Sequence, residues 1–154
     1  MAQWMAATPL SSRRWVEAVR LAYSAYLVRE YDEAIAWFGK ALGWRVIEDS
    51  DLGGGKRWVR VGGEEGGQLL LARATSDAQL AAVGKAAGGR VAYFVHTGAF
   101  DADHARMVAA GVAFAEAPRQ EAYGKVAVFA DLYGNRWDLI EAPAEVPTES
   151  GAAA

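Results

Sequence analysis

The sequence predicts one α+β domain made of two similar modules, each with the order strand, helix and three strands (βαβββ). A chain of 154 residues is the usual size of a single domain. A helix-period segment follows an apolar strand segment twice. Tyr31-Asp32 is matched by Phe100-Asp101, and Gly55-Lys56 by Gly124-Lys125, with the same offset of 69 residues (from 31 to 100 and from 55 to 124). One such module alone would leave a sheet face uncovered, so the two halves are expected to form one domain.

The first module is predicted from its periodicity and its glycine-rich breaks. A helix is expected over 31–42, where apolar residues recur at three- and four-residue steps. Asp32 is the expected N-cap, and Gly43 is the expected glycine after the helix. Four short apolar or aromatic segments predict strands, at 20–28, 44–47, 57–61 and 68–72.

The second module repeats this order after a short helical crossover at 76–89. It consists of a strand, a helix stopped by Gly111, and three further strands, over 91–95, 101–110, 112–114, 125–129 and 136–140. The domain is expected over 18–142, with modules at about 18–75 and 88–142. Residues 1–17 are an expected lead-in, and 143–154 an expected flexible tail without any hydrophobic period.

Composition and charge argue against several classes of function. The net charge is −3, and no basic stripe is present, which argues against a nucleic-acid partner. The chain contains no Cys, so neither disulfides nor Cys-ligated metal sites are expected, and a reducing cytoplasm is the expected setting. No run of about 18 apolar residues predicts a membrane span, and the first ten residues lack the pattern of a signal peptide.

Two longer segments resemble a known family. YDEAIAWFGKALGWRVIED (31–49) and AGVAFAEAPRQEAYGKVAVFADLYGNRWDLIEA (110–142) resemble the first-module signature and second-module ending of the vicinal-oxygen-chelate superfamily. This superfamily contains glyoxalases, bleomycin-resistance proteins and dioxygenases, and the resemblance covers 20–142. It implies that the two modules form a half-open, barrel-like cleft. Metal-using members place four ligands, usually His or Glu, on strands facing that cleft, where the metal acts as a Lewis acid.

The positions that match these ligands carry unsuitable side chains. They are Tyr23, Gln68 (Leu70 in the other register), Arg90 and Asp138. Only Asp138 is an ordinary ligand of a hard metal, because a guanidinium has no lone pair to donate. The expected strands at 20–28 and 68–72 contain no His or Glu. The sequence therefore predicts no metal at the family site and no other cofactor.

A polar and aromatic ligand site is expected in the cleft instead. Its predicted ligand-binding residues are Tyr23, Trp58, Arg60, Gln68, Arg90, Phe94 and Asp138. Two interpretations of the polar members are open. Either Arg90 recognises a carboxylate or phosphate of the ligand, or Arg90 and Asp138 form a buried ion pair that replaces the metal.

The remaining aromatic and histidine residues have simpler expected roles. Trp137 lies on the strand face opposite Asp138 and is expected in the core, whereas Trp58 and Phe94 are expected to form walls of the cleft. The two histidines, His96 and His104, are expected to face solvent rather than to form a metal site.

These observations favour a metal-independent protein that binds an aromatic or partly apolar small molecule. The resemblance also implies a homodimer whose clefts are completed at the interface. Two enzymatic alternatives stay open. One is a divalent-metal lyase, isomerase or dioxygenase of the glyoxalase kind. The other is a metal-free enzyme with Asp138 as the base and Arg90 as the oxyanion partner.

Overall fold

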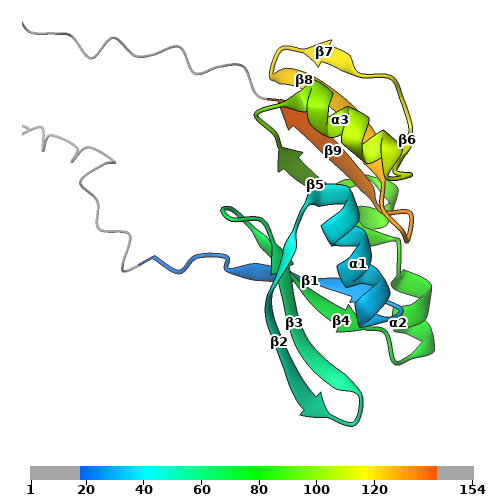
Figure 1. The fold of residues 1–154 in the computed structure, drawn as a ribbon. Helices are drawn as coiled ribbons and strands as arrows, with labels where there is room; N and C mark the ends of the chain where they lie inside the picture. Colours follow the sequence, from blue (N-terminus) through cyan, green and yellow to red (C-terminus); the bar gives the residue numbers. More distant parts are fainter. Residues whose placement is uncertain (1–17, 142–154) are drawn as a thin grey trace, which may run out of the picture.

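The computed structural model describes residues 18–141, which form two units of the predicted order, the second with one additional short strand. The first contains β1 (Tyr23–Val28), α1 (Tyr31–Leu42), β2 (Arg45–Gly53), β3 (Lys56–Gly62) and β4 (Gln68–Arg73). The second contains β5 (Val91–His96), α3 (Phe100–Ala109), β6 (Ala113–Phe114), β7 (Arg119–Glu121), β8 (Gly124–Ala130) and β9 (Arg136–Glu141). The strand orders are β1-β4-β3-β2 and β5-β9-β8-β6, and the short β7, which the sequence did not predict, pairs with β8. Figure 1 shows one sheet above the other, with α1 and α3 on the same side. The predicted α+β fold is confirmed.

Helix α1 begins and ends where its sequence pattern predicts. Tyr31, Ala34, Phe38 and Ala41 are buried, and their three- and four-residue spacing forms one apolar stripe. Gly43 ends the helix in the left-handed region (φ 67°), and its N–H donates to the carbonyl of Gly39.

The prediction for the N-cap of this helix was wrong. Glu30 is the N-cap residue and makes no capping hydrogen bond with its side chain. Asp32 lies within the first turn, where its carboxylate binds Arg57 at 2.8 Å instead of capping the backbone.

The crossover and the hairpins differ from the prediction mainly in length. The expected helical crossover consists of α2 (Asp77–Ala82), which Ser76 caps, and a short 3₁₀ turn, η3 (Ala86–Gly89). Strand β2 is longer than the expected 44–47, because it pairs with β3 as far as the turn that begins at Gly53. The expected lead-in and tail, 1–17 and 143–154, lie outside the described residues.

One hydrophobic core joins the two modules. Phe38 of α1 contacts Trp137 of β9 with ring centroids 5.9 Å apart, and Trp137 is 1% exposed, which confirms its predicted place in the core. Beneath these rings, the buried carboxylate of Asp131 accepts hydrogen bonds from Tyr26 of the first module (2.6 Å) and from the indole of Trp137 (2.9 Å). Packing and buried hydrogen bonds therefore fix one module against the other.

Candidate functional site

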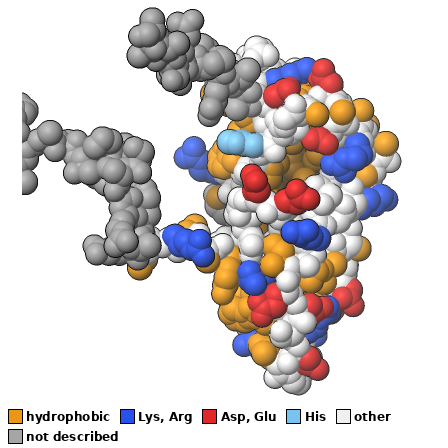
Figure 2. All heavy atoms as spheres, turned by 60° about the vertical axis from the view of Figure 1, so that its left-hand side comes forward, with side chains coloured by type: hydrophobic (Ala, Val, Ile, Leu, Met, Phe, Trp, Pro, Cys, Tyr) orange, Lys and Arg blue, Asp and Glu red, His pale blue; other side chains and the backbone are white. Residues whose placement is uncertain are grey.

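An aromatic hollow lies along the seam between the two modules. Strands β1 and β5 are the edge strands of their sheets, and the hollow between them has a volume of about 540 Å³. Its aromatic lining consists of Tyr23, Trp44, Tyr93, Phe94 and Trp137. Figure 2 shows a depression with apolar side chains on the face that includes the left-hand side of Figure 1. We call this site the seam hollow, and its size and lining are typical of a site for a flat apolar ligand.

A polar cluster on the first sheet adjoins the seam hollow. Arg60 donates to Glu48 (2.9 Å) and to the amide oxygen of Gln68 (2.5 Å), and its guanidinium lies 5.4 Å from the ring centre of Tyr23. Tyr23, Arg60 and Gln68, which the sequence predicted as site residues, are thus brought together. Together with Glu48 they line a smaller hollow of about 400 Å³, whose lining includes Tyr23 and Gln68 from the seam hollow.

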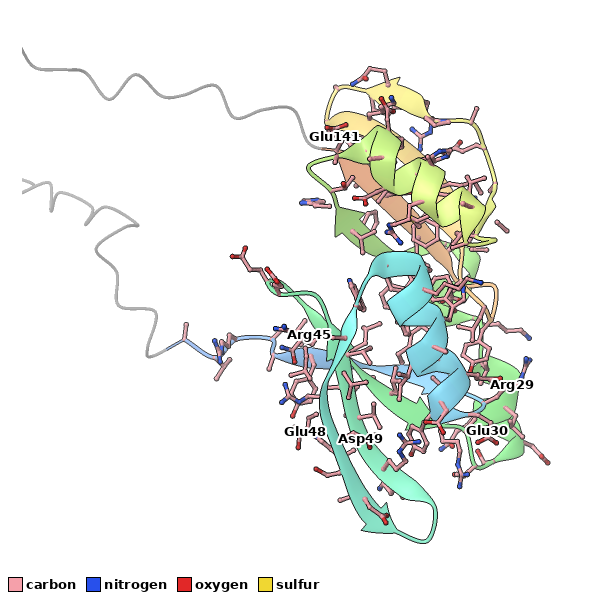
Figure 3. The ribbon with its side chains drawn as sticks, in the orientation of Figure 1. Arg29, Glu30, Arg45, Glu48, Asp49 and Glu141 are labelled. Carbon is pink, nitrogen blue, oxygen red and sulfur yellow. The ribbon has the colours of Figure 1, made fainter. Side chains whose placement is uncertain are left out.

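Glu48 was missed at the sequence level. It lies on β2 opposite Arg60, whereas its neighbour Asp49 binds Arg57. Figure 3 labels the two acidic residues next to each other on this strand. The alternation of β2 with β3 could have indicated Glu48 as the partner of Arg60, but β2 was predicted to end at residue 47.

Trp58 and Phe94 do not share a hollow. The indole of Trp58 contacts the ring of Tyr23 edge-on (6.1 Å between centroids), but it lines another hollow, of about 380 Å³, nearer the opposite end of the first sheet. Phe94 lies on the seam hollow and is 61% exposed. The predicted aromatic walls therefore belong to two separate sites.

Asp138 occupies an unusual environment on the second sheet. It lies beside Phe94 and Val128 on the neighbouring strands and is only 7% exposed. Its Oδ1 atom is buried and has no hydrogen-bond partner among the described residues. Burial raises the pKa of Asp138, Arg119 acts in the opposite direction, and Glu116 raises the pKa further. Asp138 does not line any of the three hollows, so the spare hydrogen-bonding capacity of its carboxyl group is enclosed by protein atoms and is not presented to a ligand in them.

The expected pair of Arg90 and Asp138 does not form. Arg90 is exposed, precedes β5, and makes no ion pair within the 18–141 region. Phe94 is the neighbour of Asp138, and Arg90 precedes Phe94 by four residues. Arg90 therefore lies roughly 13 Å from Asp138 along the strand direction. The buried-pair interpretation is therefore wrong. The cation that contacts other predicted site residues is Arg60.

The residues at the family's metal positions do not fit a metal ion. Tyr23 and Gln68 are neighbours on β1 and β4, but the guanidinium of Arg60 lies against both of them. A fixed cation repels a divalent ion. Arg90 and Asp138 do not converge with each other. No group of three or more metal-ligating side chains occurs within the described part of the chain.

The two histidines differ in environment. His96 is exposed and lines the seam hollow. His104 was expected to face solvent, but it is half-buried, with its ring 5.8 Å from the ring of Phe100 and 4.2 Å from that of Phe114. Its role is therefore packing on α3.

Burial of the carboxyl group of Asp138 is expected to lower the stability of the folded chain measurably. Since burial raises its pKa, the folded chain holds this proton more tightly than the unfolded chain does, and stability should fall as pH rises above the ordinary aspartate value of about 4. Asp138→Asn removes the buried charge and should raise the free energy of unfolding at pH 7 by about 1 kcal/mol. Urea unfolding at pH 5 and pH 7 measures both effects.

Asp77→Asn is the control, because Asp77 is an exposed residue in the first turn of α2. It should leave the pH dependence unchanged. A loss of stability in Asp138→Asn at pH 7 would contradict the prediction, because it would mean that the charged carboxylate is stabilised in the folded chain.

The comparisons with known proteins are consistent with this geometry. A family model described as the Glyoxalase/Bleomycin resistance protein/Dioxygenase superfamily matches residues 20–139. The chain belongs to this superfamily. An uncharacterised protein from Shewanella frigidimarina (strain NCIMB 400) is 44% identical over 124 residues, which are 79% of this chain and 92% of that protein.

Two solved structures have a similar fold. UcmS2 is 26% identical, with a TM-score of 0.69, over 80% of this chain and 98% of its own. TnmS3, described as an antibiotic binding protein from Streptomyces sp. CB03234, is 23% identical, with a TM-score of 0.61, over 82% of this chain and 98% of its own. In residues 18–141, none of the helices is both long and apolar enough to cross a membrane.

Proposed function

We propose that this superfamily member is a metal-independent binding protein for a flat aromatic or partly apolar small molecule. The observation that carries the proposal is the seam hollow, with five aromatic side chains around about 540 Å³. Burial raises the pKa of Tyr93, so its phenol stays neutral at physiological pH and presents an uncharged wall. Flat rings can stack or pack edge-on against such walls.

The polar cluster next to the hollow would orient the ligand. Glu48 and Gln68 already accept hydrogen bonds from two nitrogens of Arg60, and Glu48 offsets its charge in an ion pair at 2.9 Å. The remaining N–H groups of this guanidinium can donate to a carbonyl or hydroxyl oxygen of a neutral ligand. The protein TnmS3, described as antibiotic-binding, has this fold, so the fold is compatible with the proposed role.

We also propose that the protein is a homodimer in the cytoplasm. Within residues 18–141, edge strands β1 and β5 each pair on one side only, and the superfamily resemblance implies that a second copy completes the cleft. The cytoplasmic setting rests on the absence of Cys from the sequence.

Phe94→Ala tests the ligand site. The neutral fluorophore N-phenyl-1-naphthylamine is expected to bind the seam hollow with a saturable rise in fluorescence. Removing the exposed ring of Phe94 should weaken this binding about tenfold, since one aromatic wall contributes on the order of 1.4 kcal/mol. Leu52→Ala is the control, because Leu52 is 52% exposed and lies at the end of β2 near the hairpin turn.

Two further measurements on the same samples test metal independence and the dimer. Adding EDTA should leave the binding curve unchanged, and sedimentation velocity should give a dimer. The absence of any saturable response, or equal affinity in Phe94→Ala and the unchanged chain, would contradict the proposed ligand site. Stoichiometric metal in the purified protein that is lost in Asp138→Asn would instead support the glyoxalase-like enzyme.

A further inference from the structure

A third hollow, of about 380 Å³, lies at the end of the first sheet away from the Arg60 cluster. Its apolar lining includes Leu27, Trp58, Leu70 and Ala72. Leu27 and Ala72 are neighbours on β1 and β4, four residues along from the Tyr23 and Gln68 pair and therefore roughly 13 Å away from it. We call this site the Trp58 hollow, and its volume lies within the range of small-molecule sites.

Three cations line the Trp58 hollow, and only one of them is neutralised by carboxylates of the described residues. Arg57 pairs with Asp49 (2.6 Å) and Asp32 (2.8 Å). Arg73 is half-buried, and its guanidinium lies beside the backbone of Gly55. Neither Arg73 nor Lys56 makes an ion pair with a carboxylate of residues 18–141. The hollow therefore has an excess of positive charge next to an apolar surface.

The neutral polar groups of this hollow are also arranged as donors. The amide oxygen of Gln79 accepts from the backbone and hydroxyl of Thr75 (2.8 and 3.2 Å), which leaves its NH₂ group free to donate. The hydroxyl of Tyr31 accepts from the backbone N–H of Arg57 (3.2 Å), which leaves its own proton available. A ligand here would meet N–H and O–H groups and would need to supply acceptors.

We propose that the Trp58 hollow is a second ligand site, which binds an aromatic anion such as an arylcarboxylate or arylsulfonate. The ring of the ligand packs on Trp58 and Leu70, and its anionic group binds the fork of Arg73 with help from Lys56. The site is separate from the seam hollow, and it does not depend on the function proposed for that hollow.

The test uses two probes that share one ring system. 8-Anilinonaphthalene-1-sulfonate carries a sulfonate, whereas N-phenyl-1-naphthylamine is neutral. Arg73→Met keeps the aliphatic stem but removes the charge, and it should weaken binding of the sulfonate probe about tenfold while leaving the neutral probe unaffected. Lys56→Met, at an exposed position, should weaken binding of the sulfonate probe about threefold without a risk to folding. Arg45→Met is the matched control, since Arg45 is exposed on β2 outside all three hollows.

Competition distinguishes this site from the seam hollow. Saturating neutral probe should not displace the sulfonate probe, and Phe94→Ala should weaken only the neutral probe. If the sulfonate probe binds equally well to both charge variants, or is lost in Phe94→Ala, the second site is overturned. Loss of neutral-probe binding alone would contradict the function proposed for the seam hollow and leave the Trp58 hollow standing.

Discussion

Gly84→Ala is expected to lower the free energy of unfolding by roughly 3 kcal/mol. Gly84 lies in the crossover between the modules with φ +78°, where a side chain is strained. A Cβ atom there would lie 1.9 Å from the carbonyl oxygen of Tyr133. Backbone would have to move to relieve this overlap, because Tyr133 belongs to the loop that Asp131 holds.

Gly88→Ala is the matched control for this experiment. Gly88 also has a positive φ (+61°) and lies in the same crossover, but a Cβ atom added there would meet no described atom within 4 Å. Only the backbone strain applies at Gly88, so the free energy of unfolding is expected to fall by about 1 kcal/mol. Urea unfolding of both variants gives the comparison, and equal losses would show that the contact with Tyr133 does not restrict the packing of the crossover.

Asp131→Asn is expected to lower the free energy of unfolding by about 3 kcal/mol, because one buried carboxylate binds groups from both modules. Its Oδ2 atom accepts from Tyr26 (2.6 Å), Asn135 (3.0 Å) and Trp137 (2.9 Å). Its Oδ1 atom accepts from the backbone N–H groups of Tyr133 (2.9 Å) and Asn135 (3.0 Å). An amide cannot replace both oxygens, so at least one buried donor loses its acceptor.

Two variants serve as references for the Asp131 experiment. Tyr26→Phe removes one donor and should cost about 1 kcal/mol. Asp101→Asn removes a carboxylate that is 85% exposed and pairs with Lys125, and it should cost no more than about 0.5 kcal/mol. Chemical unfolding followed by Trp fluorescence measures all three. A loss in Asp131→Asn as small as that in Asp101→Asn would contradict a central role for the buried carboxylate.

The Asp131 network also supports the wall of the seam hollow. Tyr93 and Trp137 form part of its wall, and their rings lie 4.4 Å apart, while Trp137 is held by Asp131. Tyr133, in the same loop, donates to Glu33 of α1 (2.6 Å). Disrupting the network should therefore loosen the relative placement of the two modules that border the hollow.

Much of the fold could be predicted from the sequence because the signals are local. The spacing of Ala34, Phe38 and Ala41 defined one helix face, and Gly43 supplied the left-handed residue that ends the helix. The repeat offset correctly matched Tyr31 with Phe100, since each is the first residue of its helix. The short β7 escaped prediction because three residues paired only with β8 carry too little periodicity to be recognised.

The candidate site was predicted less completely, because periodicity defines the face on which a side chain lies but not its neighbour across the sheet. Tyr23, Arg60 and Gln68 were assigned to one site and do meet there. Trp58 and Phe94 were assigned to that site too, but they line different hollows.

The amino-acid sequence by itself determined the two-module α+β fold, the glycine that ends its first helix and the shortage of metal ligands in the first module. Only the tertiary structure decided that Arg60, and not Arg90, meets the site residues, and that Asp138 stands without a partner among the described residues. The reason is strand register. The pairing of β5 with β9 shifts between Val91 and Tyr93 and sets Phe94 beside Asp138. Such pairing depends on packing between residues far apart in the sequence, which no local pattern of the chain encodes.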